Sequence, residues 1–345
     1  LAQDLTPPTN PKVVQRAKRY DNGRLKIVMN GYSYHGKPVY HGTYQTFYNA
    51  PKRQTYYAVE YVHGKKQGKY REYFPNGVTK EEGLFAADQK TDEWTTYRED
   101  GTRKATVIWK DGKKNGPSKV YYRDGSTYLS GTYDDDLQTG LWQRFNPDKT
   151  PHSAFTYLKG KKHGPVRKYG ENGQLLAEVN YQHDLRDGTS KTWLPDGTLI
   201  KETNFKAGKP DGPAIVWYPN GQKKMQFTMN QGKKDGQSSS WFEDGKPESI
   251  MTYTSGTLTG KAKLYHQQGY ILIDGVYRDG EPYEGLFYLL AGIDDYYWMD
   301  QWDGGRMVST RLFNEGQPHS GSVTEYYGAD FVKRSFSVKD GIKNG

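Results

Sequence analysis

The sequence contains no cysteine, and no run of apolar residues is long enough to cross a membrane as a helix. The absence of cysteine excludes a disulfide framework and thiolate chemistry, and it is compatible with any compartment. Hydrophobic residues make up only 34% of the 345 positions, and the mean hydropathy is -0.99. We therefore do not expect a thick apolar core.

Aromatic residues and glycine are abundant instead. The chain has 30 Tyr, 12 Phe, 8 Trp and 40 Gly. This composition favours many short strands joined by tight turns, and so many aromatics argue against disorder. The formal net charge is +9, which fits either an acidic partner or a solubilising surface.

A glycine recurs with a period of 24 residues through the middle of the chain. It occupies Gly68, Gly116, Gly140, Gly164, Gly188, Gly212, Gly236 and Gly260, and Asp92 stands at the one missing position. Four residues earlier the sequence has only Gly or Asp, as in Gly64, Asp88 and Gly112. A backbone position with positive φ selects these residue types.

Two columns of mostly aromatic residues accompany the glycines. The first is Tyr73, Tyr97, Tyr121, Phe145, Tyr169, Trp193, Trp217, Trp241 and Tyr265, and the second is Tyr61, Phe85, Trp109, Tyr133, Tyr157, Tyr181, Phe205, Met229, Tyr253 and Tyr277. A turn such as "PNG" lies between them. Because proline cannot adopt positive φ, this turn is predicted to be a three-residue loop that ends in a left-handed glycine. We expect such a loop to place both columns on one side of the sheet.

Each repeat is thus predicted to be a β-hairpin joined to the next. The predicted fold is all-β, an elongated single-sheet array of 24-residue β-hairpin repeats, in the manner of a solenoid or meander. We divide the chain into an amino-terminal segment and cap at 1–35, a repeat array at 36–285, and degenerate repeats at 286–345 with an insertion at 289–306. The final "KDGIKNG" begins one more repeat, so the natural protein is expected to continue past Gly345.

The segments "GKKQG", "GKKNG", "GKKHG" and "GKKDG", with their following "YREYFPNG", "PSKVYYRDG", "PVRKYGENG" and "QSSSWFEDG", resemble the MORN-repeat variant of bacterial proteins. The resemblance covers about residues 61 to 285. It implies β-hairpin arrays that bind other molecules. Some members are described as antitoxin-like, and eukaryotic relatives are associated with membranes and phospholipids. No catalytic residues come with the family.

Candidate partner-binding residues lie in two places. The insertion alternates acidic and aromatic residues and is interpreted as a contact loop or as a cap over the aromatic face; its candidates are Asp294, Asp295, Tyr296, Tyr297, Trp298 and Trp302. Trp193, Trp217 and Trp241, in three consecutive repeats, form either a structural spine or a protein-binding strip. The aspartates lack the spacing of a calcium loop, so no metal is expected.

Basic residues form two further columns. Lysines of the glycine turns, which include Lys65, Lys66, Lys113, Lys114, Lys161, Lys162, Lys233 and Lys234, are expected along one edge, where they keep the sheet soluble or bind an anionic surface. Arg71, Lys119, Arg167, Lys191 and Lys263 share a face with the first aromatic column, and we expect them to stack on neighbouring rings.

The sequence carries no recognisable catalytic motif. Its eight His form no HxH or HExxH pair, and neither a G-x-S-x-G elbow nor a phosphate-binding loop is present. We predict a non-enzymatic, cofactor-free protein that binds another protein, such as an immunity or antitoxin-type inhibitor of a secreted phospholipase effector of type VI secretion. The alternative is a cell-envelope scaffold or anionic-phospholipid binder. A periplasmic or envelope location is expected, because the start "LAQDL" fits a processed or trimmed end, and no nucleic acid is expected as a partner.

Overall fold

The computed structural model describes residues 8–293, 296–327, 331–340 and 342–344. The described residues are all-β, with thirty strands and no helix, and therefore include no helix that could span a membrane. Strands β1 to β27 form an open antiparallel meander, and β28 to β30 form a separate three-stranded sheet. The predicted fold class is confirmed. By its internal contacts the chain divides into unit 1, residues 1–173, and unit 2, residues 174–345.

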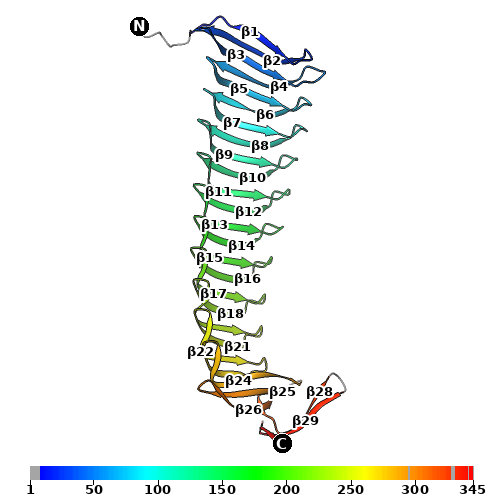
Figure 1. Ribbon diagram of the computed structural model, residues 1–345, viewed down its shortest axis with the longest axis vertical. Helices are drawn as coiled ribbons and strands as arrows, with labels where there is room; N and C mark the ends of the chain where they lie inside the picture. The colour runs from blue at the N-terminus through cyan, green and yellow to red at the C-terminus, as the bar shows by residue number, and fades with distance from the viewer. Residues whose placement is uncertain (1–7, 294–295, 328–330, 341, 345) are drawn as a thin grey trace, which may run out of the picture. The chain divides into compact units, whose positions relative to one another are not determined.

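Unit 1 contains thirteen strands, each of which pairs with the next along the chain (Figure 1). They are β1 Val14–Arg19, β2 Leu25–Tyr34, β3 Lys37–Phe47, β4 Thr55–Val62, β5 Lys65–Tyr73, β6 Thr79–Ala86, β7 Gln89–Tyr97, β8 Arg103–Lys110, β9 Lys113–Tyr121, β10 Thr127–Asp134, β11 Leu137–Phe145, β12 Pro151–Leu158 and β13 Lys161–Tyr169.

Unit 2 continues the same pattern of sequential hairpins. Its strands are β14 Leu175–Gln182, β15 Leu185–Trp193, β16 Leu199–Lys206, β17 Lys209–Trp217, β18 Lys223–Asn230, β19 Lys233–Lys234, β20 Gly236–Trp241, β21 Pro247–Thr254, β22 Thr257–Tyr265, β23 Ile271–Arg278, β24 Glu281–Ile293, β25 Tyr296–Asp303, β26 Arg306–Asn314, β27 Gln317–Pro318, β28 Gly321–Tyr327, β29 Phe331–Lys339 and β30 Ile342–Asn344. Both β19 and β20 pair with β18.

The glycine turns are two-residue hairpin turns with positive φ at both residues. Between β4 and β5, Val62 pairs with Lys65, and the turn residues His63 and Gly64 have φ of 49° and 83°. This geometry is that of a type I′ turn. The predicted positive φ at the first glycine is therefore confirmed. The second glycine, Gly68 in this repeat, also has positive φ, at 81°, and lies where the strand register shifts.

The proline turns are three-residue loops, as predicted. The Phe74 N–H donates to the Val78 carbonyl at 2.8 Å, and the Gly77 N–H donates to the Phe74 carbonyl at 2.9 Å. Gly77 closes the loop in the left-handed region, with φ of 88°. Pro75 stands first in the loop, where its fixed negative φ fits a type I turn.

The prediction that both aromatic columns share one side of the sheet is wrong. Tyr73 pairs with Thr79, but Glu72 pairs with Glu81, so Lys80 is an extra residue in β6. One extra residue turns every later side chain of the strand to the opposite side. Phe85 and the second column therefore lie on one side, called face A. Tyr73 and the first column lie on the other, called face B.

Face A is packed by cross-strand pairs of one larger and one smaller residue. Gly83 faces Trp94, and Gly131 faces Trp142; a Cβ on either glycine would overlap the indole ring. The equivalent pairs elsewhere are Val107 with Ser118, Val179 with Ser190, Thr203 with Ala214, and Met251 with Ala262. The two tryptophans are only 1% and 3% exposed. The pairing of larger with smaller residues was not identified from the sequence, because the residue types differ from repeat to repeat.

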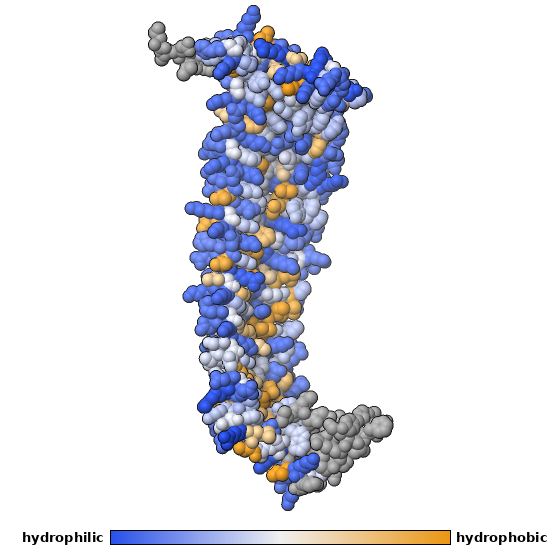
Figure 2. Space-filling view, viewed as in Figure 1, coloured by the Kyte–Doolittle hydropathy of each residue, from blue (hydrophilic) through white to orange (hydrophobic). Residues whose placement is uncertain are grey.

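The apolar clusters are small and lie on face A of each unit. In unit 1 the buried residues Val59, Phe85 and Trp94 pack together. In unit 2 the corresponding cluster is Ala262, Ile273 and Phe287. The visible surface is largely hydrophilic, with hydrophobic side chains gathered between the charged ones (Figure 2). Stability must therefore come mainly from contacts between neighbouring hairpins, as in other repeat proteins.

Candidate binding surfaces

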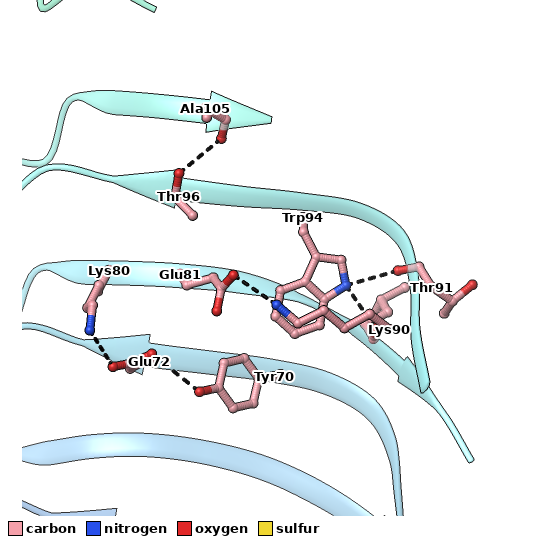
Figure 3. A network of polar contacts seen from close by, with 10 residues as sticks. Tyr70, Glu72, Lys80, Glu81, Lys90, Thr91, Trp94, Thr96 and Ala105 are labelled. Atoms are coloured by element: carbon pink, nitrogen blue, oxygen red, sulfur yellow. Dashed lines mark hydrogen bonds and ion pairs between the residues drawn. The ribbon is translucent and has the colours of Figure 1, made fainter. Parts of the chain in front are cut away.

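Face A of unit 1 is filled by rings and by charges that neutralise one another. The Lys90 ammonium lies 3.6 Å from the centre of the Trp94 ring and 3.0 Å from a carboxylate oxygen of Glu81 (Figure 3). The Trp94 indole N–H donates to the carbonyls of Leu84 and Thr91, at 3.1 and 3.2 Å. The polar groups here already have partners within the chain, so this face is primarily structural.

The lysines of the glycine turns divide into two sets. The second lysine of a turn lies over the aromatic residues of face A: Lys66 is 5.0 Å from the Phe85 ring centre, and Lys234 is 5.0 Å from that of Tyr253. Cation–π attraction accounts for this placement. The first lysines, Lys65, Lys113, Lys161 and Lys233, are exposed. Of the two sets, only the exposed first lysines form the solvent-facing row that the sequence predicted.

The cations of face B pair with carboxylates, so the expectation that they stack on rings is not met at three positions. Arg71 is 2.6 Å from Glu82, Lys191 is 3.4 Å from Glu202, and Lys263 is 3.1 Å from Asp274. Each pair joins neighbouring strands, and opposite charges directly across a sheet attract. All are partly solvent-accessible, so each contributes little to stability.

One of these pairs extends into a small network on face B. The Tyr97 hydroxyl donates to Glu82 at 2.6 Å. This hydrogen bond, together with the Arg71 guanidinium, lowers the pKa of Glu82 below its usual value. Tyr97 of the first aromatic column therefore packs beside a polar residue of the preceding strand, β6.

The three predicted tryptophans form a row on face B of unit 2. Trp193, Trp217 and Trp241 end β15, β17 and β20, and each is half-buried. Their cross-strand partners are Leu199, Lys223 and Pro247. Within the part of the chain that the structure describes, no hydrogen bond satisfies any of the three indole N–H groups. The row thus presents partly exposed indole rings and their N–H donors, spaced one repeat apart.

The described residues of the insertion lie mainly in strands. It occupies the end of β24 and all of β25, which pair with each other, and β25 also pairs with β26. Asp294 and Asp295 lie outside the described residues. Tyr296 is the first residue of β25. The partner-binding role of this segment remains a prediction.

Two aromatics of the insertion contribute to packing within unit 2. Tyr297 is 3% exposed, and its ring stacks on those of Tyr270 and Phe313, with ring centres 5.5 and 5.9 Å away. Trp302 packs against the cluster around Phe287. Trp298 is half-buried. Across the described residues no group of three or more His, Asp or Glu side chains could hold a metal ion.

Burial of tyrosines in unit 1 makes stability sensitive to alkaline pH. Burial raises the pKa of Tyr57 to about 12, and burial followed by the nearby carboxylates raises the pKa of Tyr70. An unfolded tyrosine titrates near about 10. The stabilising contribution is therefore complete below pH of about 10 and is lost as pH rises through the folded pKa values.

We expect the thermal unfolding midpoint to fall steadily above pH of about 10. Ultraviolet titration of tyrosinate should show later ionisation in the folded than in the denatured protein. Tyr70→Phe should weaken the alkaline loss, because it removes one of the hydroxyls whose pKa is raised by burial. Identical tyrosinate titrations of folded and denatured protein would contradict this expectation.

Comparison with known proteins identifies the repeat. The model of the MORN repeat variant matches residues 66–87, 162–183, 186–207 and 234–254. No curated protein matches the chain. Solved structures with some similarity include the crystal structure of TcdB2-TccC3, at 9% identity, and the Photorhabdus luminescens Tc holotoxin pore with a mutation in TccC3, at 11% identity.

These structural similarities are weak. The two alignments cover 95% and 91% of this chain but only 24% and 22% of the other chains. The TM-score is 0.18 in both cases. At that score the likeness carries no argument about function. The family matches say more: four stretches of the chain match the MORN repeat variant, and such repeats indicate a repeat protein involved in binding.

Proposed function

We propose that this protein is a non-enzymatic binding protein whose partner is another protein, and that it inhibits a toxin or effector enzyme such as a phospholipase. The observation that carries the proposal is the row of Trp193, Trp217 and Trp241 on face B of unit 2. Partly exposed tryptophan is enriched where proteins bind one another, because a large rigid ring gives contact area at a small entropic cost.

The scaffold supports the row mechanically. Each tryptophan ends a strand that is hydrogen-bonded to its neighbours, so the backbone that carries each ring is held in place before a partner arrives. Preorganised groups bind with less loss of conformational entropy than groups on a mobile loop. Covering an enzyme's active site with this rigid surface would be the inhibitory mechanism. The antitoxin-like members of the resembled family support this role, and the protein would act in the periplasm or at the cell envelope.

Co-purification from the native cell tests the proposal. A tagged wild-type chain should retain one enzyme in stoichiometric amount and suppress its activity. Trp217→Ala should weaken that complex by about tenfold or more, because central interface tryptophans contribute most of the binding energy. Tyr121→Ala is the matched control: Tyr121 stands in the same column on face B of unit 1, and its replacement should leave binding intact. If no enzyme co-purifies, or if Trp217→Ala binds like wild type, the proposal is wrong.

A second candidate, binding to an anionic phospholipid surface, is favoured by the exposed turn lysines. Lys65, Lys161 and Lys233 have no ion-pair partner among the described residues. Flotation with phosphatidylglycerol vesicles at low and high salt distinguishes the two candidates, because attraction of surface lysines to lipid is screened by salt. Salt-sensitive binding that disappears when these three lysines are replaced by serine would favour the lipid function over the protein-binding one.

A further inference from the structure

Face A of unit 2 contains a hollow where unit 1 has large rings. At the positions that hold Tyr70, Trp94 and Trp142 in unit 1, unit 2 has the small residues Ser190, Ala214, Ser238 and Ala262. A hollow of about 410 Å³ lies beside Ser190, and its lining includes Val179, Thr203, Phe205, Phe227 and Met229. Its lining combines apolar side chains with the polar Ser190 and Thr192 and with two cations.

A buried hydroxyl at this hollow lacks a partner. Thr203 is 9% exposed and lines the hollow, and its Oγ1 makes no hydrogen bond to any described residue. Buried polar groups in folded proteins are normally hydrogen-bonded. The unsatisfied hydroxyl marks this position as one where a polar group of a ligand would gain a partner.

The charge around the hollow has one sign. Arg186 and Lys201 line it, and Lys234 lies 5.1 Å from the ring centre of Phe227. Among the ladder-paired residues of face A from β14 to β22 there is no Asp or Glu. Unit 1 differs, because there Glu72 and Glu81 pair with lysines. No described carboxylate pairs with Lys201 or Arg186, so the cations of unit 2 are available to an external anion.

We propose that face A of unit 2 binds an acidic peptide segment of the partner protein, with a large apolar side chain in the hollow and flanking carboxylates on Arg186 and Lys201. The inference deepens the proposed function and rests on it in taking the partner to be a protein. An apolar group enters the hollow, the cations pair with Asp or Glu beside it, and the peptide backbone supplies a partner for Thr203. A flat anionic bilayer supplies the charge but has no side chain to fill the hollow.

The repeats themselves provide the variant that closes the hollow. Thr203→Gly with Ala214→Trp copies the Gly83 and Trp94 pair of the equivalent hairpin in unit 1, so the packing has a precedent in this chain. The probe is a fluorescein-labelled synthetic peptide in which Leu and Phe alternate with Asp and Glu, and its anisotropy is measured with the full chain. We expect the double variant to weaken binding by about tenfold or more.

Charge reversal gives a second measurement that does not depend on repacking. Lys201→Glu should weaken binding of the acidic peptide several-fold and should improve binding of a peptide with Lys in place of the acidic residues. Lys209→Glu is the matched control, because Lys209 is exposed on face B of the neighbouring strand. It should change neither affinity. Circular dichroism of each variant should match that of the wild type.

The inference is overturned if the acidic peptide fails to bind, or if both face A variants bind it as tightly as wild type. It is also overturned if phosphatidylglycerol vesicles bind to this face and the peptide does not. The proposed function fails separately: peptide binding to face A without any co-purifying enzyme would leave this inference standing and reject the inhibitor role. An enzyme that co-purifies equally with wild type and both face A variants would reject only this inference.

Discussion

Replacing Gly83 with valine is expected to lower the free energy of unfolding by about 3 kcal/mol or more. The position has no room for a side chain, because a Cβ there would overlap the ring of Trp94, which is itself 1% exposed. The ring cannot move outward without losing its two hydrogen bonds to backbone carbonyls. Chemical denaturation followed by far-ultraviolet circular dichroism would measure the loss.

A compensating replacement should restore much of the stability. The next repeat solves the same packing problem with Val107 opposite Ser118. Gly83→Val combined with Trp94→Ser copies that pair, whereas Trp94→Ser alone leaves a cavity that costs about 3–5 kcal/mol. The double variant should therefore be more stable than the sum of the two single effects predicts. Strict additivity would show that the two residues do not share one packing site.

The period and the turns could be predicted from sequence because they depend on local backbone geometry. Only glycine and a few other residues adopt positive φ, so the turns at Gly64 and Gly77 leave a visible pattern. The division of the aromatic columns between two faces could not be predicted in the same way. It depends on the extra residue Lys80, and lysine is compatible with a regular strand as well as with a bulge.

The candidate surfaces show the same limit. The row of Trp193, Trp217 and Trp241 was found because one residue type recurs at the repeat period. The hollow of unit 2 was not predicted. It depends on cross-strand pairs in which a larger residue on one strand faces a smaller residue on the next, and no single residue type recurs at these positions. A comparison of side-chain sizes at the paired positions, such as Thr203 and Ala214, would have been the usable signal.

The position of Tyr297 was also beyond sequence reasoning. Its stacking partners Tyr270 and Phe313 come from different hairpins, and the insertion breaks the 24-residue period. Burial raises the pKa of the Tyr297 hydroxyl to about 12. The hydroxyl has no hydrogen-bond partner of normal geometry among the described residues.

These contacts give Tyr297→Ala and Tyr297→Phe opposite expected outcomes. Removing the ring should lower the free energy of unfolding by about 3–5 kcal/mol, because Tyr297 is only 3% exposed and its loss leaves a cavity. Removing only the hydroxyl should leave stability unchanged or raise it, because that group is buried without a compensating bond. Thermal unfolding of both variants would measure the difference.

The same pair of variants decides what a binding experiment on the insertion means. If Tyr297→Ala loses both stability and partner binding while Tyr297→Phe keeps both, the ring acts through the packing of β24, β25 and β26, and the loss of binding does not identify a contact. If Tyr297→Ala keeps its unfolding midpoint and loses the partner, the ring is a direct contact. The stack with Tyr270 and Phe313 would then contribute little to stability, and the predicted binding role of Tyr297 would be supported.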